Sequence, residues 1–141
     1  MTLSASRHLT VAMLFASTCG CGGSTSPFSY VPVSGQVSYE DGTRIDASGM
    51  VLTFIAQEAP KVDGAHPRPA SASVDSEGRF DSVTSYKFGD GLIPGKHRVG
   101  ISYATDKNGK LLIPKEYSSA ATSPLFVDTA DAPLQIKVPK R

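Results

Sequence analysis

Apolar and polar side chains alternate along several short segments of this chain, most clearly in Val31–Tyr39. The apolar side chains of this segment fall on one face of an extended chain and the polar ones on the other: Val31, Val33, Val37 and Tyr39 against Ser34, Gln36 and Ser38. A period of two is typical of a β-strand with one buried face. Residues 132–138 alternate in the same way, so both segments are predicted strands.

The middle of the chain predicts further strands. Residues 50–56 (MVLTFIA) are apolar on both faces, as expected for a strand at the centre of a sheet. Residues 70–75 and 79–84 alternate on either side of a Ser-Glu-Gly turn, which predicts a β-hairpin. Residues 125–128 form one more short strand. The polar segment 57–69 contains three prolines and is predicted to be an exposed loop.

Residues 92–104 (LIPGKHRVGISYA) give the strongest single strand signal. A Pro-Gly turn precedes a regular alternation that places Val99, Ile101 and Tyr103 inward. The same alternation places Arg98, Gly100 and Ser102 outward. His97, at the start of the strand, is expected to be an outward or rim side chain, and His66 in the loop 57–69 to be exposed.

Together these segments predict an all-β domain over residues 31–141. Seven strands separated by turn signals such as Asp41-Gly42 and Asn108-Gly109 are most economically arranged as an antiparallel, Ig-like β-sandwich of two sheets. The 13 glycines and 10 prolines agree with a turn-rich fold. A chain of this length buries enough surface for one core without disulfides.

The first 20 residues differ from this pattern. Arg7 precedes the apolar stretch 9–18, and small residues follow it, which is the arrangement of a secretory signal peptide. The apolar stretch is too short to span the ~30 Å hydrocarbon core of a bilayer as a helix. Residues 1–20 are therefore predicted to be a signal, and the protein is expected to be exported.

Both cysteines of the chain lie at the end of this signal, at Cys19 and Cys21. Zinc needs four ligands, and the sequence nearby supplies only two. A disulfide between them would close a strained and very small ring. The segment Thr18-Cys19-Gly20-Cys21 resembles the lipobox of bacterial lipoproteins, although Thr18 stands where those signals usually have Leu.

This resemblance implies cleavage before Cys21 and attachment of a diacylglyceryl group to its sulfur. The alternatives are Cys19 as the modified residue, ordinary secretion, or a spurious start of the sequence. More than one acyl chain gives stable membrane anchoring. The Gly- and Ser-containing residues 21–30 are then a tether. The expected location is the cell envelope, at the outer membrane or on the periplasmic face.

Charge excludes one class of partner. The chain has 14 basic and 13 acidic residues, and only Arg7 of these lies in the signal. The processed chain would be neutral, so nothing in it predicts nucleic-acid binding.

Three turn motifs resemble the carboxypeptidase regulatory-like, or transthyretin-like, β-sandwich family. They are V-x-G-x-V-x-Y-x-D-G at Val33–Gly42, ASVDSEGRF at Ala72–Phe80 and GLIPGKHRV at Gly91–Val99. The segments IPKEYSS and SPLFVD, within residues 113–128, are similar to the last part of this domain in small bacterial lipoproteins. The resemblance implies a fold and says almost nothing about activity.

No catalytic, metal or cofactor site is predicted. Asp75, Glu77 and Asp81 gather around a turn but lack the spacing of an EF-hand calcium loop, and no G-x-S-x-G nucleophile motif occurs. Hydroxyisourate hydrolase shares the transthyretin-like fold, but this chain ends KVPKR and lacks that enzyme's C-terminal Tyr-Arg-Gly-Ser. The chain is therefore expected not to be an enzyme.

Two function classes remain. The first is a structural or protein-interaction module with an envelope protein as its partner. The second is a module that binds a glycan or a small molecule. Tyr86, Phe88 and Tyr117 are the aromatic residues available as a ligand surface. Tyr86 and Phe88 are nevertheless expected to pack over the open end of the sandwich.

Overall fold

The computed structural model describes residues 25–47 and 49–141. The predicted signal peptide and the lipidation site at Cys21 therefore lie outside the described residues. The described part contains seven strands and two short 3-10 helices: β1 (Gly35–Tyr39), β2 (Val51–Ala56), β3 (Ala70–Ser73), β4 (Arg79–Phe80), β5 (Lys96–Ser102), η1 (Lys115–Ser118), β6 (Phe126–Asp128), η2 (Thr129–Asp131) and β7 (Leu134–Val138).

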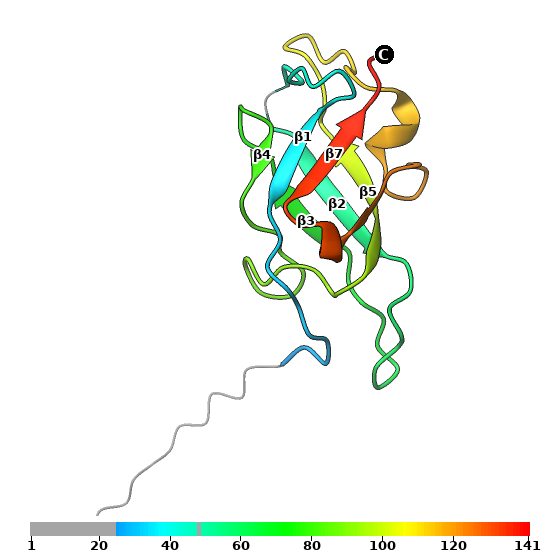
Figure 1. Cartoon of the computed structure of the whole chain (residues 1–141). Coiled ribbons are helices and arrows are strands. Elements are labelled where there is room, and N and C mark those ends of the chain that lie inside the picture. The colour runs from blue at the N-terminus through cyan, green and yellow to red at the C-terminus, as the bar shows by residue number, and fades with distance from the viewer. Residues whose placement is uncertain (1–24, 48) are drawn as a thin grey trace, which may run out of the picture.

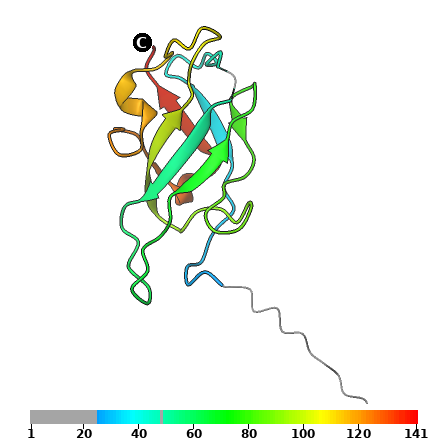
Figure 2. The same cartoon turned by 180° about the vertical axis from the view of Figure 1, so that it is seen from behind.

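The strands form two sheets (Figures 1 and 2). One sheet has three strands in the order β4-β1-β7, and the other has four in the order β3-β2-β5-β6. The prediction of an all-β domain with seven strands in two sheets is confirmed. Residues 50–56 also lie where the pattern predicts, because β2 is an interior strand between β3 and β5. Among the residues that the structure describes, no helix is long and apolar enough to cross a bilayer.

The prediction that all strands are antiparallel is wrong for one pair. β1 and β7 run parallel, in a register that joins Gly35 to Leu134 and Tyr39 to Val138. A parallel pair needs a long connection between its strands. Here that connection is almost the whole domain, so the last strand returns beside the first one in the same direction.

The predicted hairpin of residues 70–75 and 79–84 forms only in part. The turn between the two segments exists, and the Asp75 amide donates to the Arg79 carbonyl at 2.8 Å. However, β3 pairs with β2 in one sheet, whereas β4 pairs with β1 in the other. The chain thus crosses between sheets at this turn, and a backbone bridge between Ser71 and Thr84 (2.8 and 2.9 Å) holds the two segments together.

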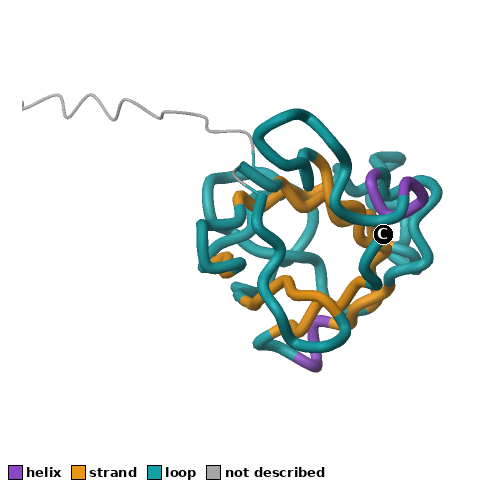
Figure 3. Tube along the Cα trace, turned by 90° about the horizontal axis from the view of Figure 1, so that it is seen from above, coloured by secondary structure: helices purple, strands orange, loops and turns teal. Residues whose placement is uncertain are grey.

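A single hydrophobic core lies between the sheets, which appear as two layers when the molecule is viewed end-on (Figure 3). Phe54 of β2 meets Phe80 of β4 across the interior, with ring centroids 6.1 Å apart. The alternation predicted for the C-terminal strand is confirmed, because Leu134, Ile136 and Val138 are buried while the residues between them are exposed. Burial of these apolar side chains is the main stabilising contribution to the fold.

Tyr103 differs from its predicted inward position. Its side chain is 70% exposed, and its backbone has a φ of 60°, which is rare for a bulky residue. The strand ends at Ser102, so the alternation that buries Val99 and Ile101 does not extend to position 103. A pattern of apolar residues cannot reveal where the backbone leaves the extended conformation.

Gly100 lies on the outer face of β5, as predicted, but it is buried by residues 119 and 120. A Cβ atom at Gly100 would overlap the backbone nitrogen of Ala120. The absence of a side chain therefore allows the segment that contains η1 to lie directly on the sheet. The Arg98 guanidinium contributes to the same contact by donating to the Ala121 carbonyl at 3.1 Å.

We expect Gly100→Ala to lower the free energy of unfolding by about 1–3 kcal/mol, because the added methyl group meets backbone that must move away. Chemical denaturation monitored by circular dichroism measures this change. Ser102→Ala, on the same face of β5, is the matched control and should change stability much less, since it adds no atom. Equal stability of Gly100→Ala and the wild type would contradict the close contact at Ala120.

Candidate functional site

The aromatic residues predicted as a ligand surface do not form one platform. Tyr86 and Phe88 belong to the loop 85–91, which lies at the same end of the molecule as residues 25–30 (Figure 1). Tyr117 lies in η1 and is half-buried against the core. The structure therefore brings Tyr86 and Phe88 to one end and leaves Tyr117 as a packing residue.

One carboxylate organises the loop 85–91. Asp90 accepts hydrogen bonds from the backbone amides of Ser85, Tyr86 and Lys87, at 2.8, 3.0 and 2.8 Å. Burial alone would raise the pKa of Asp90, but these three hydrogen bonds together lower it below its usual value. The loop is thus a defined turn that fixes the direction of the side chains between residues 85 and 90.

Phe88 occupies the tip of this turn and is 91% exposed. The backbone amide of the next residue, Gly89, donates to the Thr84 hydroxyl at 3.1 Å. This hydrogen bond holds the tip of the turn close to Thr84. The expectation that Phe88 packs over the open end of the sandwich is wrong. The side chain instead borders a shallow groove of about 390 Å³ along β3 and β4.

Tyr86 lies in a different environment, to which residues 25–31 contribute. Val31 pairs with Leu92 through two backbone hydrogen bonds of 2.8 and 3.0 Å, so the chain enters the domain directly beside the loop 85–91. Gly91 makes this approach possible, because its φ is 100° and a Cβ atom there would overlap the Val31 carbonyl oxygen.

An aromatic groove results from this approach. Phe28, Tyr30 and Tyr86 line two adjoining hollows of about 130 and 220 Å³. The Arg68 guanidinium lies 5.4 Å from the centre of the Tyr86 ring, a distance at which a cation and an aromatic face attract each other. The Ser26 and Tyr30 hydroxyls are hydrogen-bonded at 2.7 Å and help to fix the segment.

Sequence reasoning missed Phe28, Tyr30 and Arg68 as members of this groove. Residues 25–30 belong to the segment that the composition assigns to a tether. The one available signal was the pair of aromatic residues in an otherwise small and polar stretch, since a simple spacer does not need aromatic rings.

His97 is also placed differently from its prediction. It is only 2% exposed, because it lies on the same face of β5 as Val99 and Ile101. Its Nδ1 lies 3.1 Å from the Gly95 carbonyl oxygen. Burial lowers the pKa of His97 below its usual value of 6.5, although the Gly95 carbonyl and the Asp128 carboxylate oppose this shift. His66, by contrast, is exposed as predicted.

The acidic residues around Gly78 serve the turn in which they lie. Asp75 accepts from the amides of Glu77 and Arg79, each at 2.8 Å, and these bonds lower its pKa, that from Arg79 most strongly. The Glu77 carboxylate lies 3.4 Å from the Arg79 guanidinium. Among the residues that the structure describes, no three His, Cys, Asp or Glu side chains gather in a way that would hold a metal ion.

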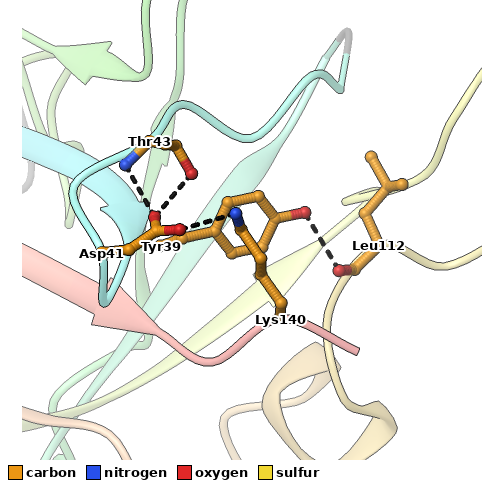
Figure 4. Close-up of polar contacts among 5 residues, drawn as sticks. All are labelled: Tyr39, Asp41, Thr43, Leu112 and Lys140. Atoms are coloured by element: carbon orange, nitrogen blue, oxygen red, sulfur yellow. Dashed lines mark hydrogen bonds and ion pairs between the residues drawn. The ribbon is translucent and has the colours of Figure 1, made fainter.

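A polar cluster at the opposite end of the molecule has a similar structural role (Figure 4). Lys140 donates to Asp41 at 2.6 Å, and Thr43 donates to the same carboxylate through its amide and hydroxyl. These hydrogen bonds, that from Lys140 first, hold the pKa of Asp41 well below its usual range. The Tyr39 hydroxyl donates to the Leu112 carbonyl at 3.1 Å. The cluster therefore fastens the C-terminal segment to the turn that follows β1.

Comparisons with known proteins add no relatives: protein-family models, curated proteins and solved structures each gave no match to this chain. The residues and their geometry are thus the basis for any functional assignment.

The buried His97 predicts a loss of stability in mild acid. Its pKa is lower in the folded chain than in the unfolded chain, so the unfolded state binds a proton first as the pH falls below about 6.5. The free energy of unfolding should therefore decrease from pH 7 towards pH 5, and urea denaturation at stepped pH measures it. In His97→Asn, which keeps a donor for the Gly95 carbonyl, this slope should become flatter. An unchanged slope would show that other groups cause it.

Proposed function

We propose that this protein is a non-catalytic lipoprotein of the bacterial cell envelope, anchored through Cys21, whose β domain is a structural or protein-interaction module. The observation that carries the proposal is the position of the cysteines. Both precede the described domain, and the lipobox-like Cys21 lies only ten residues before Val31, the first residue of the predicted β domain. An anchored domain that contains no thiol suits the oxidising conditions outside the cytoplasm.

Several polar groups of the domain support a non-catalytic role. Catalytic carboxylates and histidines need free lone pairs or protons that face a substrate. Here the carboxylates of Asp75, Asp90 and Asp106 accept backbone hydrogen bonds inside their own turns. His97, with its ring buried in the domain, does not face solvent.

We further propose that the domain is a transthyretin-like, carboxypeptidase regulatory-like sandwich. Each of the three motifs behind this resemblance occupies a structural junction. Val33–Gly42 contains β1 and its turn, Ala72–Phe80 joins β3 to β4 across the two sheets, and Gly91–Val99 leads into β5. This assignment concerns the fold, and the functional proposal does not depend on it.

The anchor predicts a sharp difference between the two cysteines. When the full chain is produced in a bacterium with lipoprotein processing, Cys21→Ser should abolish acylation and release the protein from membranes. Cys19→Ser is the matched control and should leave both unchanged, because Cys19 departs with the signal. Mass spectrometry of the N-terminal peptide, together with membrane fractionation, measures the outcome. An unmodified N-terminus beyond residue 23 in the wild type would overturn the anchor.

Binding of a glycan or small molecule is a second candidate function, and the aromatic groove favours it. Phe28, Tyr30 and Tyr86 present aromatic rings at hollows lined also by Arg68 and His66. Aromatic faces and a few polar groups in a concave surface are typical of small-ligand sites.

For this second function we expect glycan-array binding by the wild-type chain that is lost in Tyr86→Ala. Tyr103→Ala removes an exposed aromatic ring at the other end of β5 and should leave the binding intact. Thermal denaturation of each variant establishes that it is folded. Equal binding by all three proteins, or no binding by the wild type, would exclude the groove as a glycan site.

A further inference from the structure

The anchor at Cys21 and the described domain are separated by a very short piece of chain. Four residues lead from Cys21 to Thr25, the first described residue. A chain spans at most about 3.6 Å per residue, so the Cα atoms of Cys21 and Thr25 lie within about 14 Å of each other. The polar headgroup layer of one leaflet is itself about 5–8 Å thick. The end of the domain that contains Thr25 is therefore held at the membrane surface.

The structure shows which residues share that end. Thr25 lines the same hollow as Tyr86, Lys87 and Asp90 of the loop 85–91. The loops 57–69 and 85–91 both lie at the end where residues 25–30 enter, and the C-terminus lies at the opposite end (Figures 1 and 2). The N-terminal attachment therefore determines which face of the domain meets the lipid.

Phe88 is the side chain best placed to enter the lipid. It is 91% exposed at the tip of a turn that the Asp90 carboxylate holds in place. Of the other large apolar side chains that the structure exposes, Tyr103 follows the far end of β5 and Phe126 lies under the Arg98 guanidinium, 5.2 Å from it. Of these three exposed side chains in the described part of the chain, Phe88 alone belongs to the loop that shares a hollow with Thr25.

The neighbours of Phe88 suit the boundary between lipid and water. Lys87 is exposed and adjacent, and a lysine can extend its ammonium to phosphate groups while its alkyl chain lies along apolar surface. Tyr30 and Tyr86 carry a hydroxyl at one end of an apolar ring, the chemistry that favours the headgroup layer of membranes.

We propose that the loop 85–91 is a second membrane contact, in which Phe88 inserts into the headgroup region of the bilayer that holds the acyl anchor. The inference rests on the proposed function, because the anchor supplies the proximity. The occupant is a lipid surface, and the short link leaves little space for a protein between this end and the bilayer. The lipid contact fixes the orientation of the domain, with the C-terminal end directed away from the membrane.

The chain contains no tryptophan, which permits a direct test by fluorescence. The full acylated chain, purified from host membranes, is reconstituted into phosphatidylethanolamine–phosphatidylglycerol vesicles as Phe88→Trp. Tyr103→Trp, an exposed aromatic position beyond the far end of β5, is the matched control. Quenching by brominated lipids reports contact with the bilayer, and quenching by iodide reports contact with water.

We expect the indole at position 88 to be quenched by brominated lipids and several-fold less by iodide than the indole at position 103. If the acylated chain floats with the vesicles but both indoles are equally open to iodide, the inference is overturned and the anchor stands. A chain that is not acylated and does not float overturns both. Protection of position 88 in native envelope membranes but not in lipid vesicles would identify a protein partner and overturn the lipid contact.

Discussion

The parallel pairing of β1 with β7 is the constraint on which the arrangement of this molecule depends. Parallel strands run in the same direction, so the chain enters β1 at one end of the domain and leaves β7 at the other. The contact between Val31 and Leu92 then fixes the N-terminal segment beside the loop 85–91. The Lys140–Asp41 ion pair fixes the C-terminal segment at the opposite end. The two ends therefore differ in their chemistry and in their distance from any N-terminal anchor.

Much of the fold is predictable because period-two alternation directly reflects burial. For example, the alternation of apolar and polar residues predicts that Val37, Ile136 and Val138 are buried, and they are. The direction of β7 was not predictable, since parallel and antiparallel strands share the same alternation and differ only in a long-range partner. The sheet to which β4 belongs also depends on a distant partner, β1. The predicted hairpin is therefore limited to its turn and one antiparallel bridge.

The candidate site was predictable only in part. Tyr86 and Phe88 stand out in the sequence as loop aromatics, but their separate environments depend on how the N-terminal segment lies against the loop. Phe28 and Tyr30 acquire a role only through the pairing of Val31 with Leu92, which joins residues 61 positions apart in the numbering. His97 shows the opposite case. The alternation that predicts burial of Val99 also predicts burial of His97. His97 was nevertheless expected at the rim, because it directly follows a turn.

The parallel pair also has a mechanical consequence. If the chain is held at its N-terminus and pulled at its C-terminus, the force acts along β1 and β7 in opposite directions. The pair is then loaded in shear, and the hydrogen bonds along the register from Gly35–Leu134 to Tyr39–Val138 resist together rather than opening one after another. An antiparallel terminal hairpin would separate like a zipper under the same load. The topology thus makes this domain resistant to a force applied between its N-terminal and C-terminal ends.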